Sequence, residues 1–352
     1  MNYYDNLNKA IKNSLDNPEL QYQFRYFDEI SKLSKIVIDS TDNLNFKKTF
    51  SYIPINDSIQ NALSFFSSIN PQYSYMFQNI LQENVSGDYS VKFLKTLDSN
   101  QLEENMARES RVTKDGKVYI YYSNTLEDIF NITHEITHKF SQPKNQGSTI
   151  KQFLGETSSI AMEFLLQDYL FQKSDYDDNE ILAHKNNRLL ETYDDACSVL
   201  FENILLKLYK ESNGCVTQEL LFEYLNSIDK DSNLYNILSS RGEQYLNEIV
   251  NSGHLNFYIR QRYVIGTVLA SYYHDKIKNN PENVSQLCYL IDILGHTDLL
   301  ADVDLKALSN LEVPIFKNCE INIDETEVSK LSKIYKSEVL DVLRMHSKNL
   351  GI

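Results

Sequence analysis

A His-Glu-x-x-His segment at residues 134–138 constrains this chain more than any other feature of its sequence. The segment lies in an apolar pattern of helical period, which predicts a largely buried helix that ends near Phe140. The residues that set this period are Ile129, Ile132, Ile136 and Phe140. Because positions four apart share one face of a helix, His134 and His138 can offer two imidazoles to one zinc ion.

Glu135 lies beside this pair of histidines. It is placed to take a proton from a metal-activated water rather than to bind the metal, which is the division of labour in zinc peptidases. The pattern is short enough to arise by chance. The alternative interpretation is therefore that His134 and His138 are core residues that hydrogen bond to the backbone.

A hydrolytic zinc site takes three protein ligands and keeps one open position, so a third ligand must come from another segment. Glu156 and Glu163 are seven residues apart in the apolar stretch 153–166, so they share one face of a predicted buried helix. Two buried carboxylates need cations or hydrogen-bond donors to offset their desolvation. A zinc ion with its histidines would provide both.

The composition favours a mainly helical protein. The chain has 352 residues, enough for one large domain or two smaller ones, with only ten Gly and six Pro. Long runs at 3.6-residue spacing predict helices at the following ranges: 2–15, 18–39, 57–69, 71–83, 185–212, 216–228, 264–279, 284–294 and 326–348.

Residues 117–122 are β-branched and aromatic and form the best strand candidate. One interpretation is that this strand lies along a cleft, where Tyr119 and Ile120 pair with an extended peptide through main-chain hydrogen bonds. The other is a short hairpin that closes one side of the core.

Charge and hydropathy limit the partners. The formal charge of −15 makes nucleic acid or an anionic membrane surface an unfavourable partner. The chain has no run of 18 apolar residues and does not begin with a basic segment followed by an apolar one, so we expect a soluble, cytoplasmic protein that does not contact membranes. The four cysteines are scattered, which indicates reduced thiols.

At residues 117–166 the sequence resembles the family of zinc oligopeptidases that includes thimet oligopeptidase and oligoendopeptidase F. The resemblance rests on His-Glu-x-x-His followed by a helix with two Glu seven residues apart. It implies a helical zincin-type fold with a small β-hairpin or sheet beside the active-site helix and a cleft between two helical lobes. It also implies that Glu156 is the third zinc ligand and that Glu163 orients a ligand histidine.

The family has a downstream His and Tyr cluster that binds substrate and stabilises the oxyanion. By this resemblance His254 and Tyr263 are oxyanion donors and Tyr258 contacts substrate. The neighbouring Arg260 and Arg262 could bind a substrate carboxylate, but a solvated helix face explains them more simply.

Three features depart from the family. Thr137 replaces the usual Gly, Ser141 replaces a frequent His, and the chain is shorter than typical members. We expect residues 1–47 to form a short N-terminal helical segment and residues 48–352 the catalytic domain.

The function that the sequence predicts is a zinc-dependent endopeptidase that acts on short peptides. Two alternatives remain at this stage. One is a peptide-binding protein with a vestigial or structural zinc site, and the other is a helical interaction protein without metal. The sequence does not predict an oligomeric state.

Overall fold

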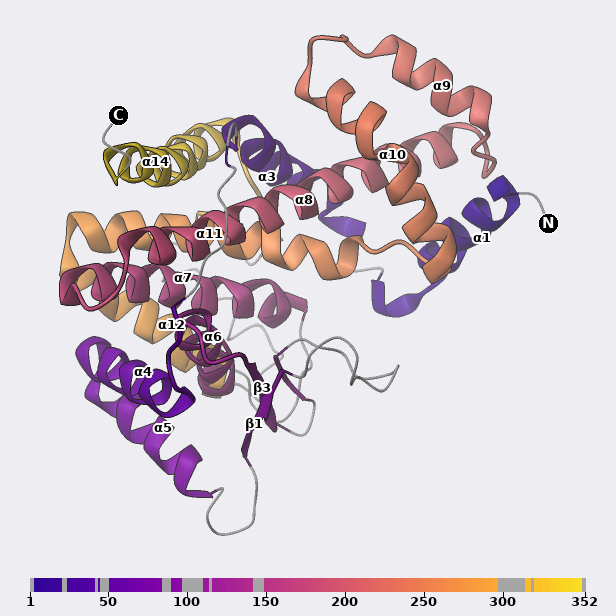
Figure 1. Cartoon of the computed structure of the whole chain (residues 1–352). Coiled ribbons are helices and arrows are strands. Elements are labelled where there is room, and N and C mark those ends of the chain that lie inside the picture. Colours follow the sequence, from indigo (N-terminus) through magenta and orange to yellow (C-terminus); the bar gives the residue numbers. More distant parts are fainter. Residues whose placement is uncertain are drawn as a thin grey trace.

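The computed structural model describes the following residues: 3–20, 24–41, 44, 51–83, 90–96, 110–113, 116–141, 149–296, 314–317 and 320–349. In these residues the protein is mainly helical, with a three-stranded sheet beside one of the helices (Figure 1). The predicted fold class is therefore confirmed.

The helices α7 (Thr149–Lys173), α8 (Asp178–Glu211) and α11 (Phe257–Asn279) form the centre of the molecule (Figure 1). Gly266 of α11 lies against Glu156 of α7, and His274 of α11 hydrogen bonds to Asp168 of α7, so these two helices run in the same direction. A short connection after Lys173 turns the chain back into α8. Apolar side chains of all three helices belong to one buried core.

The helix that carries the His-Glu-x-x-His segment is α6 (Glu127–Ser141). Its apolar face is buried as predicted: Ile129, Ile132 and Ile136 are each 0% exposed. This face packs against α4 (Ile55–Ile69), α7 and α12 (Val284–His296). At its end, the ring of Phe140 stacks on Tyr73 of α5 (Pro71–Glu83) with 5.2 Å between the ring centroids.

The sheet consists of β1 (Val91–Lys95), β2 (Arg111–Val112) and β3 (Val118–Tyr122). The strand order is β1-β3-β2, with β1 parallel and β2 antiparallel to β3. The strand predicted at 117–122 is thus confirmed as β3. It is the central strand, paired on both sides at Val118 and Tyr119, so the prediction that Tyr119 aligns a peptide through its main chain is wrong. Two short strands, β4 (Phe316–Lys317) and β5 (Glu320–Ile321), form a separate antiparallel pair.

Several helix boundaries differ from the sequence prediction. The single helix expected at 18–39 is a 3₁₀ turn at Pro18–Leu20 followed by α3 (Phe27–Ser40), whose first turn contains the favourable acids Asp28 and Glu29. Both α8 and α11 begin seven residues earlier than expected, at Asp178 against 185 and at Phe257 against 264. The helix α10 (Asn233–Ser252) was not predicted, although Ser232 caps its start and Gly253 its end.

The remaining helices are α1 (Tyr3–Leu15), α9 (Gln218–Ser227) and α14 (Glu325–Asn349). α3 packs between α8, α11 and α14, so the N-terminal part of the chain contributes to the core. The predicted domain boundary after residue 47 lies outside the described residues and stays a prediction. Within the described parts of the chain, no helix combines the length and the apolar character that a membrane span requires.

A buried polar network joins the central helices to α14. The ammonium of Lys185 contacts the carboxylate of Glu338, and His274 hydrogen bonds to Glu338 at 2.8 Å and to Asp168 at 2.9 Å. Lys185, His274 and Glu338 are each at most 5% exposed. Although burial alone would raise it, Lys185 and His274 hold the pKa of Glu338 well below its usual range.

We expect Lys185→Met to lower the free energy of unfolding by about 3 kcal/mol, because it leaves a buried carboxylate without its strongest cation. The control is Lys278→Met, which removes the cation of a partly exposed pair with Asp341 and should cost less than about 1 kcal/mol. Urea denaturation followed by circular dichroism measures both. Equal losses in the two variants would contradict a stabilising role for the buried network.

Candidate metal centre and surrounding cavity

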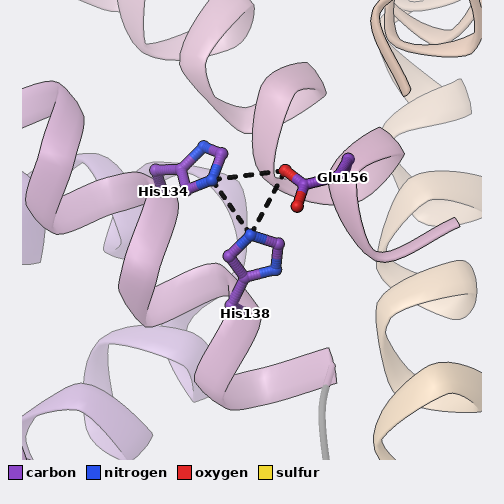
Figure 2. A group of neighbouring side chains, drawn as sticks. All are labelled: His134, His138 and Glu156. Atoms are coloured by element: carbon purple, nitrogen blue, oxygen red, sulfur yellow. Dashed lines mark hydrogen bonds and ion pairs between the residues drawn. The ribbon is translucent and has the colours of Figure 1, made fainter. Parts of the chain in front are cut away.

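Three side chains from α6 and α7 converge on one point (Figure 2). The Nε2 atoms of His134 and His138 are 2.9 Å apart, and the Oε2 atom of Glu156 lies 3.5 Å from the first and 3.4 Å from the second. Ligand atoms around one tetrahedral zinc ion are about 3.4 Å apart, given metal–ligand bonds of about 2.1 Å. The spacing therefore suits a single metal ion.

The chemistry of these donors also fits a metal ion. His134 donates its Nδ1 proton to Glu163, which leaves the lone pair of Nε2 directed at the common point. The Oε2 atom of Glu156 is buried and has no hydrogen-bond partner among the described residues. A divalent cation would coordinate that oxygen and both Nε2 atoms. Without a cation, the two Nε2 atoms of His134 and His138 would need a proton between them.

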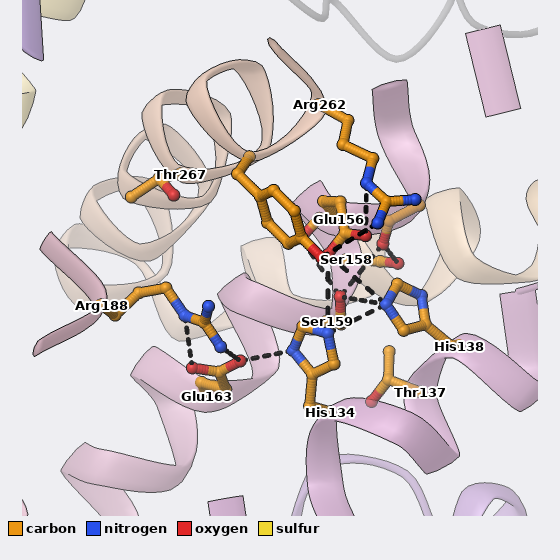
Figure 3. A network of polar contacts seen from close by, with 12 residues as sticks. His134, Thr137, His138, Glu156, Ser158, Ser159, Glu163, Arg188, Arg262 and Thr267 are labelled. Atoms are coloured by element: carbon orange, nitrogen blue, oxygen red, sulfur yellow. Dashed lines mark hydrogen bonds and ion pairs between the residues drawn. The ribbon is translucent and has the colours of Figure 1, made fainter. Parts of the chain in front are cut away.

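Glu163 is a buried carboxylate, 1% exposed, that is surrounded by donors (Figure 3). Arg188 of α8 donates from Nε to Oε2 at 3.2 Å and from a terminal nitrogen to Oε1 at 2.9 Å. His184 of α8 donates to Oε2 at 2.8 Å, and His134 contacts Oε1. These donors hold the pKa of Glu163 well below its usual range against the effect of burial. Glu163 thus contacts His134, and its role in orienting a zinc ligand stays a prediction of the resemblance.

His184 extends this set of contacts to the wall of the cavity. Its Nε2 faces Glu163 and its Nδ1 lies 3.0 Å from Oε1 of Glu127, while its ring stacks on Phe130 at 3.7 Å. Burial opposes a charge on the imidazole, but the two carboxylates prevail and raise the pKa of His184 to about 9. A protonated His184 donates to both carboxylates, and on Glu163 it reaches Oε2, the oxygen that His134 does not contact.

Gly266 sets the distance between α11 and the third candidate ligand. A Cβ atom at this position would lie 2.6 Å from the Cβ of Glu156 and 3.1 Å from its carbonyl carbon. No side chain larger than hydrogen fits there without a shift of α7 or α11. The close approach therefore fixes where the Glu156 carboxylate lies relative to α6.

A cavity of about 730 Å³ adjoins the candidate metal centre at His134. Its wall is formed by α6, α8, α11 and the ends of β1 and β3, and it contains His134, Glu135, Arg262 and Tyr263. The Oε2 atom of Glu135 is buried without a hydrogen-bond partner among the described residues, and burial raises the pKa of this carboxyl, opposed by the two histidines. Glu135 is not part of the group whose ligand atoms converge, so it lies beside the candidate metal centre.

The other predicted site residues are distributed differently. Tyr263 lines the cavity, but His254 does not: it lies in the turn between α10 and α11, with its Nδ1 3.1 Å from the carbonyl of Leu255. That turn is held against α1 by a hydrogen bond from Leu255 to Ser14, so the structure does not bring His254 to the metal centre. The side chain of Tyr258 lies outside the described residues, and its role stays a prediction.

The residue of β3 that lines the cavity is not one of the two that the sequence predicted. Ile120 is 0% exposed and part of the core, and neither it nor Tyr119 lines the cavity. Tyr121 lines it instead, together with Ser110 and Ser123. Tyr119 and Ile120 therefore do not line this cavity, and their contact with a substrate stays a prediction.

Arginines 188 and 262 are site residues that the sequence interpretation missed. Arg188 carried no signal, because its partner Glu163 is 25 residues away. Arg262 was assigned to a solvated face, yet its Nε lies 3.6 Å from Oε1 of Glu156 and its side chain is 37% exposed (Figure 3). One sequence feature could have indicated the position of Arg262. It precedes Gly266 by four residues, so the two share one face of the helix.

We expect Gly266→Ala to weaken zinc binding by at least about tenfold, because the added methyl group displaces Glu156. The matched control is Gly242→Ala, where the new Cβ atom meets only Phe201 at an ordinary 3.8 Å. Titration against a chromophoric chelator measures the affinity of both. Wild-type affinity in a folded Gly266→Ala protein would show that this helix spacing does not position the ligand.

We expect His184→Gln to weaken zinc binding by about tenfold, because Glu163 loses a donor and holds His134 less firmly. His274→Gln is the control, since His274 is a buried histidine between two carboxylates that do not adjoin the metal centre. The same chelator titration applies. Equal effects of the two substitutions would indicate a general loss of stability instead of a loss of orientation.

Comparisons with known proteins show the fold. No protein-family model and no curated protein matches the sequence. Two solved structures match 93% of the chain: a Chlamydophila abortus protein described as a "putative peptidase" (18% identity, TM-score 0.57) and PZ peptidase A with an inhibitor (14% identity, TM-score 0.54). The chain spans only 56% and 59% of their respective lengths. The protein therefore has the mainly helical fold found in these peptidase structures.

Proposed function

We propose that the protein is a zinc-dependent endopeptidase that hydrolyses short peptides. The observation that carries the proposal is the convergence of His134, His138 and Glu156, whose ligand atoms lie within 4.8 Å of one another, beside Glu135 on the cavity wall. The fold shared with two structures named as peptidases supports it. The resemblance to the oligopeptidase family is part of the same proposal.

In this proposal His134, His138 and Glu156 hold zinc. A bound zinc ion supplies Lewis acidity, which acidifies water and polarises a peptide carbonyl. Glu135 accepts the proton of the attacking water on its carboxylate and passes it to the departing amine. Glu163, Arg188 and His184 keep the His134 ring in its orientation.

Tyr263 is the proposed donor to the oxygen that becomes negatively charged. It lines the same cavity as Glu135, and the nearby Glu156 carboxylate and burial raise its pKa, so it is a phenol at neutral pH. A preorganised donor of this kind contributes about 3 kcal/mol to the transition state. His254 has no part in this assignment, because it lies outside the cavity wall.

The dimensions of the cavity suit a short peptide. A volume of about 730 Å³ lies within the range of enclosed ligand sites, and the wall is formed by both aromatic and charged side chains. Tyr121, Ser110 and Ser123 offer polar groups at one rim. The peptide main chain has donors and acceptors that such groups can satisfy.

We expect Glu135→Gln to retain zinc and to lower the cleavage rate by several orders of magnitude, since the amide cannot accept the proton. The control is Glu223→Gln, which removes an exposed carboxylate from α9. Both variants and the wild type are incubated with a mixed library of short peptides, and products and bound zinc are read by mass spectrometry. Internal cuts by wild type and control alone support the proposal.

Two other results would overturn this proposal. Cleavage by zinc-loaded Glu135→Gln at the wild-type rate would remove Glu135 from its role. Saturable peptide binding by zinc-loaded wild type, without cuts in any peptide, would identify a peptide-binding protein.

A further inference from the structure

Arg262 and Tyr263 are consecutive residues of α11 that interact with each other at the cavity wall. A terminal nitrogen of Arg262 donates to the hydroxyl oxygen of Tyr263 at 3.0 Å. The guanidinium also lies 4.8 Å from the centroid of the Tyr263 ring. Two separate contacts, one polar and one with the ring face, thus hold the phenol in place.

The position of the pair follows from the packing of α11 on α7. Gly266 contacts Glu156 directly, and residues three and four positions earlier in a helix lie on the same face one turn away. Arg262 and Tyr263 therefore reach toward the Glu156 carboxylate. The Nε of Arg262 lies 3.6 Å from Oε1 of Glu156, is buried, and has no hydrogen-bond partner among the described residues.

The contact between the two side chains has a chemical consequence. A phenol oxygen can accept and donate a hydrogen bond, whereas a guanidinium can only donate. Because Arg262 occupies the acceptor side of the Tyr263 hydroxyl, the phenol proton must point to another acceptor. The adjacent cationic charge also stabilises negative charge that the phenol takes on when it donates.

We propose that Arg262 is a positioning residue that holds the Tyr263 hydroxyl with its proton directed at the reacting carbonyl oxygen in the cavity. This inference rests on the proposed function, in which Tyr263 donates a hydrogen bond to a substrate oxygen. Arg262 acts through Tyr263 and does not itself touch the substrate. The other arginines that line the cavity, Arg188 of α8 and Arg260 of α11, are each paired with two carboxylates.

The test is a double-mutant cycle with Arg262→Met and Tyr263→Phe, measured on a peptide that the wild type cleaves. Tyr263→Phe should lower kcat by about 100-fold, the usual effect of losing one oxyanion donor. Arg262→Met should lower kcat by about tenfold while KM changes less than about twofold, since only the transition state uses the oriented proton. Added to Tyr263→Phe, it should lower kcat no further.

Two further variants separate positioning from a general structural effect. Arg262→Lys keeps the positive charge and N–H donors but loses the planar guanidinium, so it should recover part of the kcat lost in Arg262→Met. Lys278→Met removes a cation from the same helix 16 residues away, about 24 Å along its axis, and should leave kcat and KM unchanged. Bound zinc and the melting temperature are measured for every variant and should match the wild type.

Several results would overturn the inference. Multiplicative losses in the double variant would show that Arg262 acts independently of Tyr263. If Arg262→Met raised KM and left kcat unchanged, Arg262 would be a substrate-binding group. If Arg262→Met lost its zinc, Arg262 would act by holding the Glu156 carboxylate. If zinc-loaded wild type cleaved no peptide, both the proposed function and this inference would be overturned. If the wild type cleaved peptides but the free-energy effects of the two substitutions on kcat were additive, this inference alone would be overturned.

Discussion

The rest of the site depends on the hydrogen bonds and ion pairs that surround the buried carboxylate of Glu163. An ionised carboxylate in a protein core costs several kcal/mol unless donors and cations surround it. Here the compensation comes from His134 of α6 and from Arg188 and His184 of α8, while Glu163 itself belongs to α7. Three helices are therefore held together by one charged group. The orientation of a candidate metal ligand is a consequence of that packing.

The second constraint is the close contact of α7 with α11. Gly266 allows the backbones to approach at Glu156, and the same contact places Tyr263 on the wall of the cavity. Some distance along the same two helices, His274 and Asp168 are hydrogen bonded, and Glu338 joins them to Lys185 of α8. The three central helices thus share polar contacts at the metal centre and again far from it, which limits their freedom to slide.

What the sequence predicts well is local. The pair His134 and His138 needs only one helix turn, so helical periodicity was sufficient to predict that their two imidazoles meet. Glu156 and Glu163 share a face of α7 for the same reason, but that Glu156 meets α6 came only from a family resemblance. The strand β3 was recognised from its residues, yet its central place in the sheet depends on β1 and β2, which were not predicted.

What the sequence does not predict are contacts between helices far apart in the chain. Arg188 and His184 meet Glu163 across more than 20 residues, and neither belongs to a motif. His254 shows the opposite error. A resemblance in spacing placed it in the site, but α11 begins at Phe257, where Glu202 accepts hydrogen bonds from the first backbone amides, and His254 falls in the preceding turn.

The chain is strongly acidic, but many of the carboxylates at the cavity wall are paired with arginines. Several carboxylates line the wall, yet Asp195 lies 3.7 Å from Arg260, Glu191 lies 3.2 Å from Arg188, and Asp194 contacts Arg241. Such pairs largely cancel each other at the distance of a bound peptide. Glu135 differs, because its buried Oε2 has no hydrogen-bond partner among the described residues. Under the proposed function, Glu135 is therefore a carboxylate of this wall that is available to accept a proton.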